Sequence, residues 1–152
     1  KQCVAYATDK VDILPVKEKK ITIKKRWFYY PVLTYKEKMA IRQRTAKDIW
    51  QGLYEFPLIE TEKEVTVKDI IQKLKKNKWV IKNNYEVIAT SPLFKQQLSH
   101  QLIAGRFMKI NLLKKPVLKN DWQWVTIKEI RKFAFPQFIN QYLMEKGKKG
   151  LF

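Results

Sequence analysis

Few side chains in this sequence have the types and spacing that catalysis or metal binding requires. The chain carries one cysteine and one histidine, Cys3 and His100, so it cannot supply the four ligands of a structural zinc site. A Cys–His catalytic pair would need these two residues to meet, and we do not favour it because Cys3 lies in an N-terminal segment that we interpret as a leader. The four glycines are scattered along the chain, so no glycine-rich phosphate loop is present.

A helix is expected to begin at Thr66, which can cap it together with Asp69 three residues later. Apolar residues follow at helical spacing, and lysines gather toward the C-terminal end, where they complement the helix dipole. Asp69 is the single carboxylate of the stretch 67–76. Magnesium prefers several hard oxygen ligands. We therefore expect a structural helix without a divalent cation.

The charge balance is the strongest signal in the composition. Lys and Arg number 32 against 14 Asp and Glu, for a formal net charge of +18. Such a charge attracts polyanions, with nucleic acid as the first candidate and an anionic membrane surface as the second. A host whose proteins are rich in lysine is the alternative without a function, and only five of the basic residues are arginine. Because lysine contacts phosphate as a point charge, the composition favours backbone binding over base reading.

Hydrophobic periodicity predicts a mixture of strands and helices within one domain. Strands are expected at 21–35, 39–44, 53–59, 87–90, 98–112 and 122–125. We expect the first two to form a hairpin, Pro57 to interrupt the third, and 98–112 to be half-buried with a bend at Gly105. A short helix should follow Thr126, and a last helix should begin near Pro136 and bury Ile139, Tyr142 and Leu143. This pattern predicts an α+β fold.

Residues 40–44 and the stretch Trp50-Gln51-Gly52-Leu53-Tyr54-Glu55-Phe56-Pro57 resemble the corresponding part of Nudix proteins. A Nudix hydrolase continues with a Gly-Gly turn and a helix carrying several carboxylates that hold Mg²⁺. The helix expected after Thr66 departs from that pattern, since it offers one carboxylate among lysines. An active Nudix pyrophosphohydrolase is therefore the alternative function from the enzyme class.

The chain resembles more closely the C-terminal domain of MutY-type adenine DNA glycosylases, which is Nudix-like without the Nudix signature. Four segments carry the resemblance in order: Cys3 with Leu14-Pro15-Val16-Lys17, the stretch 50–57, Leu98-Ser99-His100, and Lys132-Phe133-Ala134-Phe135-Pro136. Tyr54 and Leu98 depart from the Trp and Phe or similar residues of the family. The resemblance implies a Nudix-like α+β fold with a mixed or antiparallel central sheet flanked by helices. It also implies that 1–20 is a linker from a missing catalytic domain and that 21–152 is the lesion-recognition domain.

The same resemblance implies a DNA-binding site at Gln97, Leu98, Ser99 and His100. The Ser99 hydroxyl would bond the edge of 8-oxoguanine, since it can donate and accept. Leu98 would act as an apolar wedge without the stacking of an aromatic ring. His100 would support the loop or reach a phosphate. The alternatives are an ordinary polar residue at Ser99 and a structural histidine at His100.

The resemblance further implies that no catalytic residue lies in this chain and that the fragment alone is inactive. The parent protein would hydrolyse the N-glycosidic bond of adenine paired with 8-oxoguanine, and Cys3 would be the fourth ligand of its 4Fe–4S cluster. Expected partners are double-stranded DNA with that mispair and the protein's own N-terminal catalytic domain, with no membrane. We expect a bacterial cytoplasmic location, at the nucleoid through DNA.

Two further questions stay open at the level of sequence. A generic nucleic-acid-binding module without lesion preference is the second alternative function. Several aromatic residues could form a stacking surface, but we favour a place for them in the core: Trp50, Tyr54, Phe56, Trp122 and Trp124.

Overall fold

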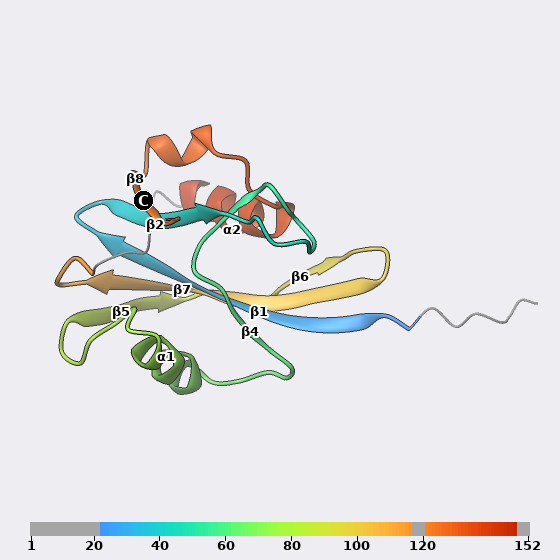
Figure 1. Cartoon of the computed structure of the whole chain (residues 1–152), viewed down its shortest axis with the longest axis horizontal. Helices are drawn as coiled ribbons and strands as arrows, with labels where there is room; N and C mark the ends of the chain where they lie inside the picture. Colours follow the sequence, from blue (N-terminus) through green and yellow to red (C-terminus); the bar gives the residue numbers. More distant parts are fainter. Residues whose placement is uncertain (1–21, 117–120, 149–152) are drawn as a thin grey trace, which may run out of the picture.

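A computed structural model describes residues 22–116 and 121–148. Figure 1 shows one twisted sheet with helix α1 (Val67–Lys76) against one face and helix α2 (Gln137–Lys148) against the other. The predicted linker 1–20, with Cys3 and residues 14–17, lies outside the described residues. No helix in the described part of the chain is long and apolar enough to cross a membrane.

The sheet is mixed, as predicted. Its strands are β1 (Lys24–Tyr35), β2 (Lys38–Gln43), β3 (Tyr54–Glu55), β4 (Ile59–Thr61), β5 (Tyr85–Thr90), β6 (Phe94–Gln97), β7 (Gln101–Leu112) and β8 (Gln123–Thr126). The order β3-β2-β1-β7-β5 forms the main path, while β4, β6 and β8 pair with β1, β7 and β2 respectively. The two long central strands, β1 and β7, run parallel, and the other pairs are antiparallel.

Strand β1 changes its partner along its length. Its first half pairs with β4 through Trp27–Tyr29, and its far end pairs with β2 at Thr34 and Tyr35. Pro31, which has no N–H for a ladder bond, falls between these two pairings. The predicted β1–β2 hairpin is confirmed. It turns at Lys36 and Glu37, both with positive φ, as a tight hairpin of type I′ requires.

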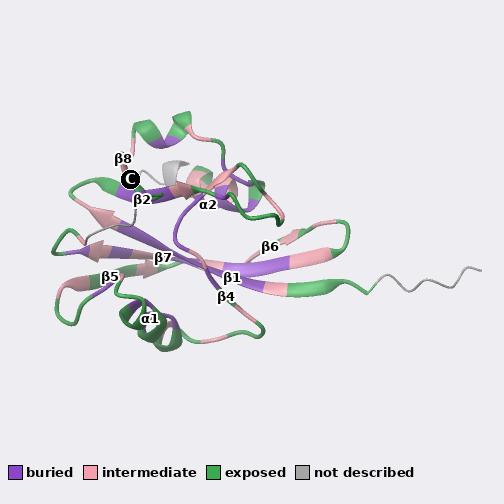
Figure 2. Cartoon of the chain, in the orientation of Figure 1, coloured by how far each residue is buried: buried purple, intermediate pink, exposed green. Residues whose placement is uncertain are grey.

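Two apolar clusters fill the two sides of the sheet. Trp27, Tyr29 and Met108 belong to the cluster beneath α1, while Phe28 and Phe107 belong to the cluster beneath α2. Consecutive residues of β1 and β7 are therefore buried on opposite faces. Figure 2 shows an unbroken buried stretch in the middle of β1, while β7 alternates between buried and intermediate residues. The expectation of a half-buried strand at 98–112 was wrong because helices cover both faces of β7.

Other element boundaries differ from expectation in instructive ways. Residues 98–100 form the turn that joins β6 to β7, and β6 itself was not predicted. The strand expected at 53–59 is split into β3 and β4, with Pro57 between them. Residues 66–76 behave as predicted, since the Thr66 hydroxyl accepts from the Asp69 amide and the Asp69 carboxylate accepts from the Thr66 amide. The short helix after Thr126 is a 3-10 helix, η1 (Glu129–Lys132).

Candidate nucleic-acid interface

The predicted site residues meet at one end of the molecule, in the β6–β7 hairpin. Gln97 ends β6, and the next three residues make the turn before Gln101 opens β7. Gln97, Ser99 and His100 are exposed, whereas Leu98 is half-buried and packs against the cluster beneath α2. Figure 2 shows the hairpin tip in the colour of exposed residues beyond the buried strands. In this conformation Ser99 and His100 are accessible, but the side chain of Leu98 faces the protein.

Hydrogen bonds close the turn from within. The Leu98 amide donates to the Gln101 carbonyl at 2.7 Å. The side-chain amide of Gln97 donates to the carbonyls of Leu98, at 2.7 Å, and Gln101, at 3.3 Å. Gln97 therefore stabilises the hairpin, and the hydroxyl of Ser99 and the ring of His100 are the polar groups that the turn presents to solvent.

Lysines surround the hairpin on the neighbouring strands. The amide of Lys24, in β1, donates to the His100 carbonyl at 3.0 Å, which ties the start of β1 to the turn. Across β7, Lys25 is paired with Leu102 and Lys95 with Ala104, so the side chains of Lys25 and Lys95 lie on the same face. All three lysines are exposed, and no acid among the described residues forms an ion pair with them. The hairpin end thus combines cations with exposed polar groups, which suits a polyanion.

Arg26, in β1, lies beside this hairpin. It contacts acidic side chains of β4 and of the 44–50 loop. Its guanidinium bonds Glu60 twice at 2.8 Å, Asp48 twice at 3.0 Å and the side-chain oxygen of Gln101 at 3.0 Å. The hydrogen bonds that Arg26 donates to Glu60, and secondly to Asp48, raise the pKa of Arg26 above its ordinary value, so it stays charged. The hydrogen bond from Arg26 also lowers the pKa of Asp48 to about 2, against the opposing effect of burial.

A buried ion pair extends the same network into the core. Arg44 bonds Glu55 at 2.7 Å, with side-chain exposures of 8% and 1%, and it also reaches Asp48 at 3.0 Å. Glu55 is part of the stretch 50–57 on which the resemblance rests. Glu55 also accepts from Arg42, at 3.3 Å, so each buried charge of this pair has a second partner of opposite sign, as a buried ion pair requires. We infer that the Arg44–Glu55 ion pair holds the end of β2 against β3.

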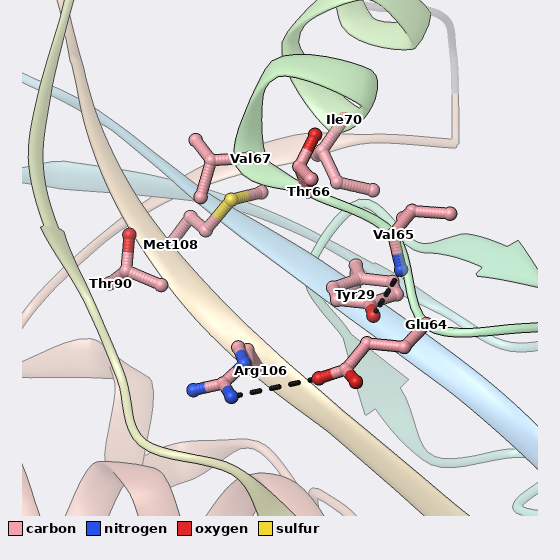
Figure 3. A pocket seen from close by; sticks show the side chains of 9 residues that line it. All are labelled: Tyr29, Glu64, Val65, Thr66, Val67, Ile70, Thr90, Arg106 and Met108. Atoms are coloured by element: carbon pink, nitrogen blue, oxygen red, sulfur yellow. Dashed lines mark hydrogen bonds and ion pairs between the residues drawn. The ribbon is translucent and has the colours of Figure 1, made fainter.

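A separate pocket of about 470 Å³ opens at the start of α1. Figure 3 shows Tyr29 accepting a hydrogen bond from the Val65 amide, at 3.0 Å, and Glu64 facing Arg106, at 3.7 Å. Glu64 is the one carboxylate in its lining, and the other lining residues are Thr66, Val67, Ile70, Thr90 and Met108. Within residues 22–116 and 121–148, no three His, Cys, Asp or Glu residues gather to hold a metal ion. A single carboxylate paired with an arginine is a poor donor set for Mg²⁺.

The aromatic residues that we assigned to the core are indeed packed there. Phe56 and Trp122 are buried, and Trp50, Tyr54 and Trp124 are half-buried against the two clusters. Trp50 has its ring centroid 5.7 Å from that of Phe28. These aromatic side chains form no exposed stacking surface for bases.

Residues 29–145 match the family described as "NUDIX domain". The chain belongs to the NUDIX domain family. This match agrees with the mixed sheet and its two flanking helices, and it confirms the predicted α+β Nudix-like fold. The carboxylate-poor helix α1 of this NUDIX domain is the departure that the sequence predicted.

An adenine DNA glycosylase of Buchnera aphidicola subsp. Schizaphis graminum is 34% identical over 101 residues, which are 65% of this chain and 26% of that protein. The matched stretch therefore spans about a quarter of that relative. The C-terminal domain of mouse MUTYH, solved in complex with human PCNA, shares the fold with a TM-score of 0.62 at 14% identity, over 82% of this chain and 88% of that one. A MutT protein from Methanosarcina mazei Go1 also has a TM-score of 0.62, at 8% identity, covering 84% and 96%.

Sequence reasoning located the hairpin tip but missed its surroundings. Arg26, Gln101 and the lysines of β1 were not predicted as part of the site. Arg26 carried a usable signal, because it is one of five arginines in a chain dominated by lysine. Its carboxylate partners are 22 and 34 residues away in sequence, so no local pattern could reveal them.

Proposed function

We propose that this NUDIX domain reads 8-oxoguanine opposite misincorporated adenine, as part of an adenine DNA glycosylase. The observation that carries the proposal is the hairpin at Gln97–His100, which presents an exposed hydroxyl beside three exposed lysines. The 34% identity to an adenine DNA glycosylase supports the context. A domain of this kind contributes specificity, while base excision belongs to another part of the polypeptide.

The Ser99 hydroxyl suits the chemistry of the lesion. Oxidised guanine differs from guanine by an 8-oxo acceptor and an N7–H donor, and a hydroxyl can satisfy either group. One good hydrogen-bonded contact to a base contributes about 1–3 kcal/mol of discrimination. Lysines at the strand ends would contact phosphates, adding affinity that is independent of sequence and weakened by salt.

The parent reaction would take place outside this domain. Adenine would be flipped from the duplex into a catalytic site, where its N-glycosidic bond is hydrolysed. A 4Fe–4S cluster in the parent, with Cys3 as its fourth ligand, stays a prediction. The donor chemistry fits, since cysteine thiolates are the usual cluster ligands, but this chain offers a single cysteine and the other three would have to come from a longer polypeptide.

The proposal is tested by comparing duplexes that differ in one oxidised base. The affinity of the 152-residue chain is measured by fluorescence anisotropy for 8-oxoG:A and G:A duplexes at a fixed, low salt concentration. We expect tighter binding to the oxidised duplex. Equal affinities would favour a generic nucleic-acid-binding module and would reject lesion reading by this domain.

A second assay separates this proposal from the hydrolase alternative. The chain is incubated with Mg²⁺ and oxidised or normal nucleoside triphosphates, and product is followed by chromatography. We expect no turnover, because α1 presents Asp69 alone and that carboxylate is engaged with Thr66 in the helix cap. Robust hydrolysis would overturn our interpretation of α1 as a structural helix.

A further inference from the structure

The guanidinium of Arg26 has every one of its donors occupied. A guanidinium carries five N–H groups, and Arg26 makes five side-chain hydrogen bonds: two to Glu60, two to Asp48 and one to Gln101. The side chain is 11% exposed, and it lies over the ring of Phe28 at 4.8 Å. A planar fork saturated in this way has one orientation, because rotation would break several bonds at once.

The fifth of these bonds leads directly to the base of the hairpin. Gln101 accepts from Arg26 through its side-chain oxygen, at 3.0 Å, and its main-chain carbonyl accepts from the Leu98 amide, at 2.7 Å. Immediately before it, the His100 carbonyl accepts from the Lys24 amide. Strand β1 therefore holds the descending arm of the hairpin by main chain at one residue and by side chain at the next.

We propose that Arg26 is a positioning residue, which fixes the Gln97–His100 hairpin through Gln101 and thereby sets its preference for the oxidised base. This inference rests on the proposed function of the hairpin. Arg26 touches no base itself. Glu60 and Asp48 hold its guanidinium in place, and the guanidinium in turn holds the side chain of Gln101, the residue that closes the turn.

Asp48, which binds the other side of the Arg26 guanidinium, is itself held by two further hydrogen bonds. Asp48 also accepts from Arg44, at 3.0 Å, and from the Ile49 amide, at 2.7 Å, and Arg44 in turn bonds the buried Glu55. The guanidinium thus sits between the core of the β2–β3 region and the exposed turn. Cutting the link at Gln101 would remove the side-chain restraint on the hairpin while leaving its main-chain bonds and the ion pairs of Arg26 intact.

Gln101→Met is the decisive variant, because methionine has a similar length but its thioether is only a weak acceptor for the bond from Arg26. Gln43→Met is the matched control. Gln43 also makes one side-chain bond, to the Gly52 carbonyl at 2.9 Å, in a loop that does not contain the hairpin. Arg26→Lys keeps the charge but loses the five-donor fork, and it serves as a second variant of the same link.

Two measurements on the 152-residue chain decide the matter. Amide hydrogen exchange at Leu98 reports the hairpin without DNA, and we expect it to be about fivefold faster in Gln101→Met, the factor that corresponds to one ordinary hydrogen bond. The ratio of dissociation constants for G:A and 8-oxoG:A duplexes reports reading, and we expect Gln101→Met and Arg26→Lys to lower it. Gln43→Met should change neither quantity. A purely structural role would weaken both duplexes equally and leave their ratio unchanged.

Each outcome is informative. Faster exchange with a reduced ratio supports the proposal. Unchanged exchange at Leu98, or faster exchange with an unchanged ratio, overturns it while the proposed function stands. If the unaltered chain has no preference for 8-oxoG:A, the proposed function itself fails, and the positioning role in lesion reading fails with it.

Discussion

Lys25 and Lys95 lie on the same face of the sheet, on the two strands that flank β7 beside the hairpin turn. Lys25 is paired with Leu102, and Lys95 is paired with Ala104 two residues further along β7. The ammonium of Lys25 also lies over the ring of Trp27, at 4.6 Å from its centroid, which restrains this exposed side chain. On the proposed function, these two lysines contact phosphates of the bound duplex.

Replacing both lysines, as Lys25→Gln with Lys95→Gln, should weaken DNA binding without changing lesion preference. Loss of two phosphate contacts lowers the slope of log affinity against log salt by about two, since each contact contributes roughly 0.9. The slope is measured by anisotropy over a series of salt concentrations. Lys73→Gln with Lys76→Gln on α1, away from the hairpin, is the control (Figure 1). An equal loss in the control would indicate a diffuse charge effect.

Ser99→Ala, unlike the double lysine variant, should change the preference for the oxidised duplex more than the overall affinity for DNA. The hydroxyl is exposed at the hairpin tip, so its removal should not disturb packing. We expect the ratio of affinities for 8-oxoG:A and G:A duplexes to fall about fivefold or more, which corresponds to ~1 kcal/mol or more of lost discrimination. Thr45→Ala removes an exposed hydroxyl from another loop and should leave the ratio unchanged. An unaltered ratio in Ser99→Ala would exclude Ser99 from the site.

Asp48 should contribute a stability that depends on pH at the acid end. Its pKa is about 2 in the folded protein because Arg26 bonds its carboxylate, and about 3.9 in an unfolded chain. A lowered folded pKa favours folding above pH ~4, and this contribution is lost as the pH falls toward about 2. Urea midpoints of the unaltered chain should therefore drop more between pH 4 and pH 2 than those of Asp48→Asn.

Asp121→Asn is the control for that experiment, because Asp121 pairs with Arg42 at 3.2 Å but is 60% exposed. Water screens an exposed pair of this kind, so its variant should follow the unaltered chain. If Asp48→Asn loses stability on acidification as steeply as the unaltered chain, the Arg26–Asp48 bond does not form in solution as described.

Gly105 should not tolerate a side chain. It is paired with Phe28 in the parallel β1–β7 ladder, and a Cβ at this position would lie 1.6 Å from the Phe28 carbonyl oxygen. Since the obstacle is main chain, the two central strands would have to separate. Gly105→Ala should therefore lower the free energy of unfolding by roughly 1–3 kcal/mol or more, the range typical of overpacking. A urea midpoint equal to that of the unaltered chain would show that the strands are further apart.

Local patterns predicted much of the fold. Alternating apolar residues located β1 and β2, and the Thr66–Asp69 spacing located the start of α1. The stretch 50–57 predicted a Nudix-like domain, which the family match confirms. These features depend on neighbours within a few residues, which is why sequence was sufficient for them.

Burial on both sides of β1 and β7 was beyond such patterns. The alternating pattern predicted that 98–112 would be buried on one face only, yet Phe107 of β7 and Phe28 of β1 belong to a second core beneath α2. Which faces of a strand are covered depends on where distant helices pack. The strand β6 was missed for a related reason, because its sequence, Phe-Lys-Gln-Gln, is polar and its pairing with β7 alone makes it a strand.

The sequence by itself determined the family and the positive charge, and it suggested Ser99 as the candidate reader with His100 as a loop or phosphate contact. Only the tertiary structure decided that these residues occupy an exposed turn, that lysines of β1 and β6 border it, and that Arg26 reaches its base through Gln101. The physical reason is distance along the chain. Arg26 and Gln101 are 75 residues apart, and only the parallel pairing of two central strands brings the guanidinium to the amide that it holds.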